Sequence, residues 1–277
     1  MITKYLAPVA VCLCTASLSF AATVNFSSAV IDPSNTGSFL DNSGAFMEAV
    51  KLGTARTGPY TYNAPTASSN PNPNVTLNGI TFTSSAGSVN PSGSFYSLAS
   101  VTGGATLGYD TGRFSNVSSV NQSLYGLVYD VLRTGGNNQR LTLNLKNLTI
   151  GASYELQMVL SELNTADNPA SNMSDRNVMV SAGAFTQSTD EQHGAGADGN
   201  IGFLSYGPTT GARLVTATFT ADSSTELFSL LSGSTGGNSR VALAGFVISQ
   251  VPEPSTYAMM LLGAVGLAKL GRRSKQG

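Results

Sequence analysis

Few side chains in this sequence belong to the types that perform covalent or acid–base catalysis. The chain of 277 residues has a single histidine, His193, and two cysteines, Cys12 and Cys14, close to its N-terminus. A Ser-His-acid triad would have to use His193, which lies in the Gly-rich run 190–200, a poor place to hold a base in register. The sequence also has no HExxH motif and no Cys/His spacing typical of a metal site. We therefore expect no catalytic residues of these classes.

Paired carboxylates are the remaining route to catalysis, because two of them can hydrolyse a glycosidic bond. Glu155 and Glu162 lie on or near one expected strand, 154–160. They are seven residues apart, which places them on opposite faces of a regular strand. The sequence therefore favours a protein that is not an enzyme, with a glycoside hydrolase as the less favoured alternative.

The run 190–200 also carries hard oxygen donors that could hold a cation. Its glycines allow tight turns around an ion, and calcium prefers such oxygen ligands. The spacing does not fit an EF-hand loop. Two interpretations stay open, a structural calcium that pins a long loop and a solvated acidic loop, and no other cofactor is expected. The candidate calcium ligands are Asp190, Glu191, Asp198 and Asn200.

Two loops share a short sequence echo, T-G-G-N-N-Q-R at 134–140 and T-G-G-N-S-R at 235–240, and each runs into an expected strand. Gly-Gly-Asn suits turn positions with positive φ, and the arginine could clamp a ligand or a neighbouring carboxylate. Two similar turns with structural arginines are the alternative. If both loops lie at one end of the fold, they form the best candidate surface for a glycan, with Tyr206, Arg140, Arg240, Asn137 and Asn238 as its residues.

Any platform for stacking a sugar would have to be built from tyrosine, since the chain has ten tyrosines and no tryptophan. Most tyrosines are expected in the core or on a sheet face. The candidates for loops or sheet edges are Tyr109, Tyr125, Tyr129 and Tyr206.

The elements that must position these groups are almost all strands. Residues 140–146 alternate strictly between polar and apolar, and 154–160 follows after the turn at 150–152, so we expect two adjacent strands joined by a tight connection. No segment between the two chain ends shows helical periodicity over three turns. The pattern predicts an all-β fold, a single antiparallel two-sheet β-sandwich of the jelly-roll type. The other expected strands are 23–26, 46–52, 79–83, 124–132, 177–180, 213–220, 226–231 and 241–248.

Residues 1–21 predict a signal peptide. A short positive segment ending at Lys4 precedes the apolar run 5–18, and small residues place cleavage after Ala21 or Ala22. Both cysteines would leave with this peptide, so the exported chain would have neither a disulfide nor a thiolate. The domain 22–250 holds nine of the 14 Lys and Arg residues and every Asp and Glu except Glu253, which gives it a formal charge of −5. This balance argues against nucleic-acid binding.

Residues 251–277 combine a Pro-Glu-Pro triplet (Pro252, Glu253 and Pro254), an uncharged apolar run at 257–268 and a basic cluster that includes Arg272 and Arg273. In this order at the C-terminus, they resemble the PEP-CTERM sorting signal, which is handled by membrane proteases of the exosortase type. The resemblance implies an exported protein, anchored in the inner membrane as a precursor and then found at the cell surface or in the extracellular matrix. The 16 residues 255–270 would make about 24 Å of helix, a short transmembrane segment suited to a temporary hold.

The domain itself is similar to the galactose-binding-like and malectin-like jelly rolls. The similarity lies in the segments 148–154, 156–162, 175–180 and 242–248. It implies a fold whose members often bind sugars, although a fold does not carry a function with it. We therefore expect a non-enzymatic structural or adhesive protein of the cell surface or matrix. The alternative is a carbohydrate-binding module for exopolysaccharide.

Overall fold

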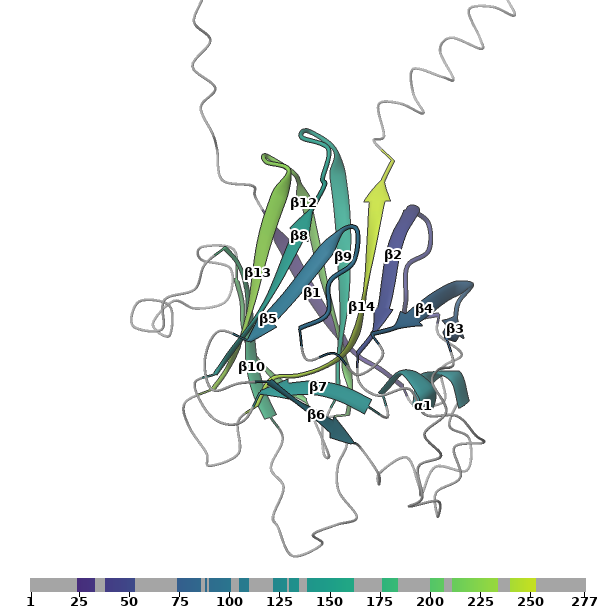
Figure 1. The fold of residues 1–277 in the computed structure, drawn as a ribbon, viewed down its shortest axis with the longest axis vertical. Helices are drawn as coiled ribbons and strands as arrows, with labels where there is room; N and C mark the ends of the chain where they lie inside the picture. Colours follow the sequence, from purple (N-terminus) through teal and green to yellow (C-terminus); the bar gives the residue numbers. More distant parts are fainter. Residues whose placement is uncertain are drawn as a thin grey trace, which may run out of the picture.

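The computed structural model is built almost entirely of β-strands arranged in two sheets (Figure 1). It describes residues 24–32, 38–52, 74–85, 88, 90–100, 105–109, 122–128, 130–134, 139–161, 176–183, 200–206, 211–233 and 240–252. The expected signal peptide and the tail beyond Pro252 lie outside these residues. Within the described part of the chain, no helix has the length and apolar character needed to cross a membrane.

The larger sheet has nine strands and the smaller sheet has five. The larger sheet runs in the order β1 (Asn25–Val30), β12 (Arg213–Thr220), β9 (Ser153–Leu160), β14 (Ala242–Val251), β2 (Ala45–Lys51), β4 (Ile80–Ser84) and β3 (Val75–Leu77), with β7 (Asp130–Thr134) pairing β14 and β6 (Ala105–Tyr109) pairing β7. The smaller sheet runs in the order β11 (Asn200–Tyr206), β10 (Arg176–Ala182), β13 (Thr225–Ser232), β8 (Arg140–Lys146) and β5 (Tyr96–Ser100).

The core lies between the two sheets, as period-2 alternation requires. On β8, Leu141, Leu143 and Leu145 are fully buried while the residues between them are half-buried. Aromatic pairs bridge the sheets. The Phe219 ring of β12 lies 5.5 Å from the Phe228 ring of β13, centroid to centroid, and Tyr96 of β5 meets Phe246 of β14 edge-on at 4.9 Å. The expectation of an all-β fold with two sheets is confirmed.

The strand pairs are nested in sequence. Strand β10 pairs β11, β9 pairs β12, β8 pairs β13 and β7 pairs β14, all antiparallel. The chain therefore forms one long two-stranded ribbon that passes from sheet to sheet. At one end of the molecule the connections 147–152 and 221–224 cross together, with Leu148 N–H donating to Ser224 O (3.1 Å) and Gly151 N–H to Ala221 O (2.8 Å).

This ribbon corrects the expectation that 140–146 and 154–160 are adjacent strands. They are β8 and β9, which lie in different sheets. The connection 147–152 pairs with 221–224 and carries the chain across the core, so it does not close a hairpin. Positive φ angles at Asn147 (58°) and Gly151 (83°) make the change of direction. A tight turn in the sequence fixes where the chain bends, and long-range pairing decides which sheet it joins.

Two further expectations were wrong. Segment 124–132 is a short helix, α1 (Gln122–Val128), followed by β7. Its buried residues Leu124, Leu127 and Val128 follow helical i, i+3, i+4 spacing, which an apolar run of this length fits as well as a strand. The sandwich is also not wholly antiparallel, because β2 pairs β4 in parallel. Strands β3, β5, β6 and β11 were not foreseen.

Tyr206 provides a test of the contact between the sheets. It ends β11 of the smaller sheet and is fully buried. Its hydroxyl donates to the Arg240 carbonyl (2.7 Å) and accepts from the Ala242 N–H (2.8 Å), at the start of β14 in the larger sheet.

We expect Tyr206→Phe to lower the free energy of unfolding by about 1–3 kcal/mol, because both buried backbone groups lose their partner. Urea denaturation measures the change. Thr142→Val, which removes an exposed hydroxyl that donates to Ala99 O, is the control and should change stability by less than about 0.5 kcal/mol. Equal effects of the two substitutions would contradict the proposed role of the tyrosine hydroxyl.

Candidate functional site

The two loops with the Gly-Gly-Asn echo are anchored at the same end of the molecule. Thr134 N–H donates to Val241 O and Gln139 N–H donates to Ser232 Oγ, at 3.0 and 2.9 Å. These four residues close the connections from β7 to β8 and from β13 to β14. The echo therefore occurs in two connections, each of which joins a strand of one sheet to a strand of the other at this end of the molecule. Asn137 and Asn238 themselves lie outside the described residues.

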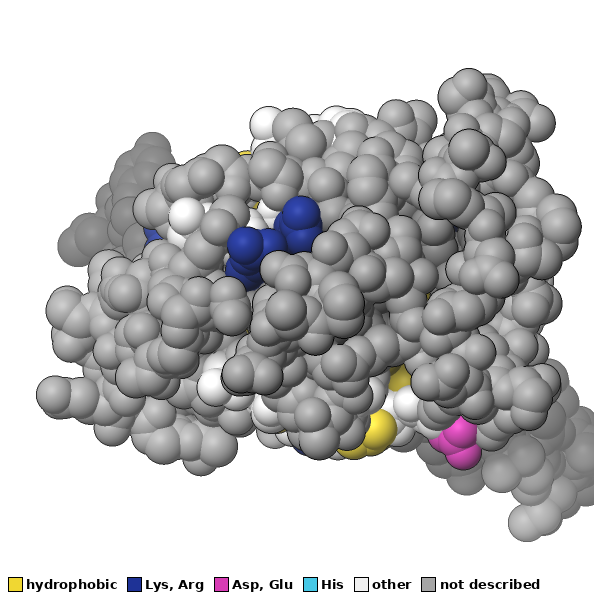
Figure 2. All heavy atoms as spheres, turned by 90° about the horizontal axis from the view of Figure 1, so that it is seen from below, with side chains coloured by type: hydrophobic (Ala, Val, Ile, Leu, Met, Phe, Trp, Pro, Cys, Tyr) yellow, Lys and Arg dark blue, Asp and Glu magenta, His cyan; other side chains and the backbone are white. Residues whose placement is uncertain are grey.

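Arginines gather at this end of the fold. Figure 2 looks onto it and shows Lys and Arg side chains grouped near its centre. Arg140 starts β8 and Arg240 precedes β14, and both are half-buried. Arg213, at the start of β12, donates to Ser205 O and to Ser28 Oγ and so ties β12 to its neighbours. A glycan contact by Arg140 and Arg240 stays a prediction.

Tyr206 does not belong to this candidate glycan surface. Tyr206 is fully buried and both faces of its ring lie within the core, so it offers no platform to a sugar. Its polar atom is engaged by the backbone of β14. Tyr109 belongs to β6 and Tyr125 to α1, whereas Tyr129 lies outside the described residues.

The calcium hypothesis falls mostly outside the described part of the chain. Asp190, Glu191 and Asp198 are not described, and Asn200 is the first residue of β11. Across the residues that are described, no group of three or more His, Cys, Asp or Glu side chains is arranged to hold a metal ion. A calcium at 190–200 stays a prediction.

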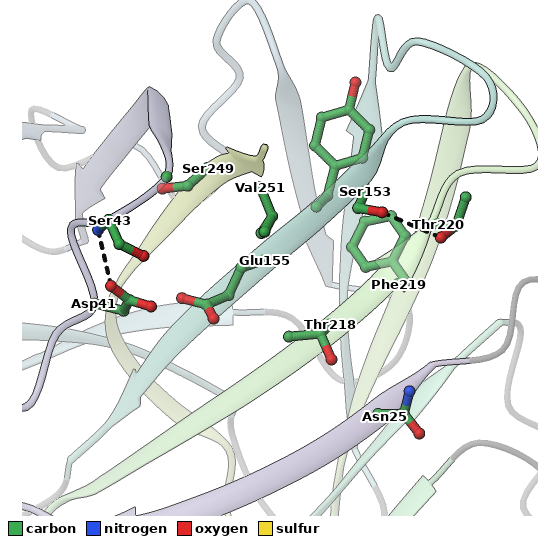
Figure 3. A pocket seen from close by; sticks show the side chains of 12 residues that line it. Asn25, Asp41, Ser43, Ser153, Glu155, Thr218, Phe219, Thr220, Ser249 and Val251 are labelled. Atoms are coloured by element: carbon green, nitrogen blue, oxygen red, sulfur yellow. Dashed lines mark hydrogen bonds between the residues drawn. The ribbon is translucent and has the colours of Figure 1, made fainter. Parts of the chain in front are cut away.

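A cleft of about 280 Å³ lies at the opposite end, on the outer face of the larger sheet (Figure 3). We call it the Asp41–Glu155 cleft. Its floor is a row of residues in register on four neighbouring strands, and the loop 41–44 forms a wall beside it. The floor consists of Asn25 (β1), Thr218 (β12), Glu155 (β9) and Ser249 (β14), with Ser153, Thr220 and Val251 in the next row.

The position of Asp41 is fixed by a buried amide. The Asp41 N–H donates to Gln157 Oε1 (2.9 Å), and Gln157 Nε2 donates to Asp41 O (2.8 Å). Gln157 is 1% exposed and lies two residues beyond Glu155 on the same face of β9. The Asp41 carboxylate in turn accepts from Ser43 N–H at 2.8 Å. The backbone of the wall is thereby locked to the strand that carries Glu155.

The carboxyl group of Glu155 has a raised pKa. Burial raises the pKa of Glu155, and the negative charge of Asp41 raises it further, while a hydrogen bond from the Gln157 side chain acts in the opposite direction. In Figure 3 both carboxylates point into the same space. An arrangement of this kind can hold a proton, accept hydrogen bonds from hydroxyl groups or attract a cationic group.

The sequence suggests Glu155 as one member of a carboxylate pair, but it suggests Glu162 as the other. Glu162 lies outside the described residues. Asp41, the neighbour of Glu155, is remote in sequence, and the Gln157 side chain that positions it spans 116 residues. The triplet Asp41-Asn-Ser43 is typical of a turn in which a side-chain oxygen binds the backbone two residues on. The sequence around this turn does not predict which strand the turn packs against.

A second hollow, of about 380 Å³, lies between β2, β4 and the residues before β5. Its carboxylate, Glu48, accepts a hydrogen bond from Phe95 N–H at 3.0 Å. Burial, together with the charge of Glu48, raises the pKa of Tyr96 to about 12, so this phenol stays neutral. Among the described residues that line this hollow, Glu48 is the one carboxylate, and it is already engaged, so the Asp41–Glu155 cleft is the better candidate site.

Beyond the cleft, the chain continues from Val251 into the tail, and here the comparison with known families is decisive. Residues 250–276 match the PEP-CTERM protein-sorting motif. The prediction of a PEP-CTERM sorting motif in the tail is confirmed. The PEP-CTERM motif marks an exported protein that is anchored transiently in the membrane and processed by exosortase, a membrane protein.

The rest of the chain has no comparable match. No curated protein matches the sequence. Among solved structures, 45% of the chain is similar to 15% of an enzyme described as a novel family GH115 4-O-methyl-α-glucuronidase with specificity for decorated arabinogalactans. The sequence identity is 13% and the TM-score is 0.27, which is too low to carry an argument about fold or function.

The PEP-CTERM motif begins inside the fold. Its first residues, Gln250 and Val251, are the last two of β14 and pair with Tyr154 and Ser153 of β9. Asn25, at the start of β1, lies in the floor of the same cleft. The cleft therefore lies at the end of the domain from which both chain termini continue.

The raised pKa of Glu155 gives a stability test with a definite sign. Glu155 keeps its proton to a higher pH in the folded protein than in the unfolded chain. Its ionisation therefore lowers the free energy of unfolding. We expect Glu155→Gln to match the wild type well below the ordinary carboxyl pKa and to be more stable above it. Asp41→Asn should give a smaller change in the same direction, since burial is the larger cause. Thermal unfolding between pH 3 and pH 8 measures both differences, and a constant difference across that range would contradict the assignment.

Proposed function

We propose that this chain is a non-enzymatic, surface-directed structural or adhesive protein, held in the inner membrane by its PEP-CTERM tail and then delivered to the cell surface or extracellular matrix. The observation that carries the proposal is the sorting motif at 250–276, which starts in the last two residues of β14. Export through a signal peptide that is cleaved after Ala21 or Ala22 belongs to the same proposal.

The position of the tail supports a short-lived membrane state. No linker separates β14 from the motif, so the domain of an unprocessed chain would sit against the bilayer. The apolar stretch 255–270 is shorter than the roughly 20 residues of a usual span. Both features suit a hold that ends when the tail is processed.

The nested strand pairing supports a jelly roll, in which a two-stranded ribbon folds across two sheets. On this basis we keep the galactose-binding-like and malectin-like jelly rolls as the proposed fold group. A carbohydrate-binding module for exopolysaccharide is therefore the alternative function.

The sorting proposal predicts a change of cell fraction. Deleting 252–277 leaves β14 complete and removes the motif, and Pro252, Glu253 and Pro254 changed together to alanine is the finer variant. We expect both variants to leave the membrane fraction and to fail to reach the surface-associated fraction. Immunoblots of separated fractions measure this, with an alanine substitution of Asn25 as a matched control. An unchanged distribution of both variants would contradict the proposal.

A second candidate function rests on the Asp41–Glu155 pair. A carboxyl with raised pKa beside a second carboxylate is the arrangement that glycoside hydrolases use for acid and base roles. Against turnover, Tyr154 and Phe219 alternate with Glu155 and Thr218 along their strands, so their rings lie in the core, 1% and 4% exposed, and do not face the cleft. A sugar would therefore lack a stacking face to hold it in a reactive orientation.

The hydrolase alternative predicts turnover that depends on both carboxyls. If it is correct, the full chain releases reducing sugar from matrix polysaccharide, and Glu155→Gln and Asp41→Asn each reduce the rate by at least about 100-fold. We expect no turnover above the rate of a heat-denatured control. Turnover that both substitutions abolish would replace the non-enzymatic proposal.

A further inference from the structure

The floor of the Asp41–Glu155 cleft is rich in groups that both donate and accept hydrogen bonds. Hydroxyls from three separate segments are accessible in it, and each can serve as donor or acceptor. They belong to Ser43, Thr218 and the pair Ser153 and Thr220, whose oxygens lie 3.4 Å apart, and Asn25 adds an amide, whereas Ser249 is only 4% exposed. A ligand that carries several hydroxyls of its own would find a partner for each in this row.

The cleft is also negatively charged. Asp41 and Glu155 are the acidic residues among the described residues that line it, and those described residues include no Lys or Arg. In Figure 3 the two carboxylates point into one space, which leaves room for a positive group between them. Burial is the larger cause of the raised pKa of Glu155 and the charge of Asp41 is the smaller one, and a positive group at this place would favour the ionised form of Glu155 against both. A neutral ligand would not.

The same lining disfavours other ligands. Tyr154 and Phe219 are covered, so a planar aromatic ligand would have no ring to stack on. The volume of about 280 Å³ lies at the lower limit of small-molecule sites, which start at about 300 Å³, and so fits a single ring. A lysine side chain from a protein partner would use the two carboxylates but leave the row of hydroxyls unused.

We infer that the Asp41–Glu155 cleft binds one residue of an amino sugar whose amine is free and protonated. The ammonium group lies between the carboxylates of Asp41 and Glu155, and the sugar hydroxyls bond to the side chains of the floor. This inference rests on the proposed function, because it names the class of matrix polymer that the delivered domain would hold.

The test uses the purified full chain in detergent and two probes, a tetramer of β-1,4-linked glucosamine and its fully N-acetylated counterpart, measured by titration calorimetry. We expect the free-amine tetramer to bind and the acetylated one to bind at least about tenfold more weakly, because acetylation removes the charge. Glu155→Gln and Asp41→Asn should each weaken binding of the free-amine tetramer by about tenfold. Thr218→Val, which leaves both carboxyls intact, should weaken it by about threefold.

A second acidic pair supplies the matched control. Glu226 lies near Asp222, and burial together with that neighbour raises the pKa of Glu226 to about 7, yet neither residue lines the cleft. Glu226→Gln should leave binding unchanged. An equal loss in Glu226→Gln would mean general attraction to an acidic surface, and equal binding of the acetylated tetramer would mean a neutral-sugar site. Either result overturns the inference, as does the absence of binding.

Two further outcomes are separable. Poly-lysine that binds with the same dependence on Asp41 and Glu155, while the sugar does not, would assign the cleft to a protein partner and overturn the sugar. Correct delivery to the cell surface without any amino-sugar binding would overturn this inference and leave the proposed function intact. Failed delivery with normal amino-sugar binding would overturn the proposed function and leave this inference intact.

Discussion

Strand β14 is the constraint on which the rest of the structure depends. Eight of its ten residues are buried, and it pairs β9 on one side and β2 and β7 on the other. At Gly245 a Cβ would lie 2.6 Å from Val50 O, so the close approach of β2 requires glycine there. The sorting motif starts on this same strand. Cleavage immediately before Val251 would remove the pair that this residue forms with Ser153 of β9.

The sequence predicts the strands well where burial follows local alternation. The expected 140–146 and 213–220 coincide with β8 and β12, because every second side chain of these strands enters the core. It fails where the outcome depends on distant partners. The run 124–132 is apolar enough for either element, and packing of α1 against β3, β7 and β14 buries Leu124, Leu127 and Val128. Short strands such as β3 exist because a neighbour pairs with them.

The two candidate surfaces also differ in how far the sequence predicts them. The two connections that carry the Gly-Gly-Asn echo are anchored at one end of the fold, a placement that the sequence leaves open. The cleft carries no such repeat. Glu155 is placed by the register of β9, whereas Asp41 is placed by the side chain of Gln157, which is buried on an outer sheet face and reads as an ordinary strand residue. A contact between residues 116 positions apart leaves no periodic trace in the sequence.

The location of the cleft links binding to sorting. It opens between the strands that begin and end the domain, with Asn25 on one side and Val251 on the other. If the tail is held in the membrane as proposed, this end of the molecule would face the bilayer, because β14 passes into the motif without a linker. A polymer chain would then reach the cleft only after release. Sorting would then precede ligand binding for a geometric reason, without any conformational change in the sandwich.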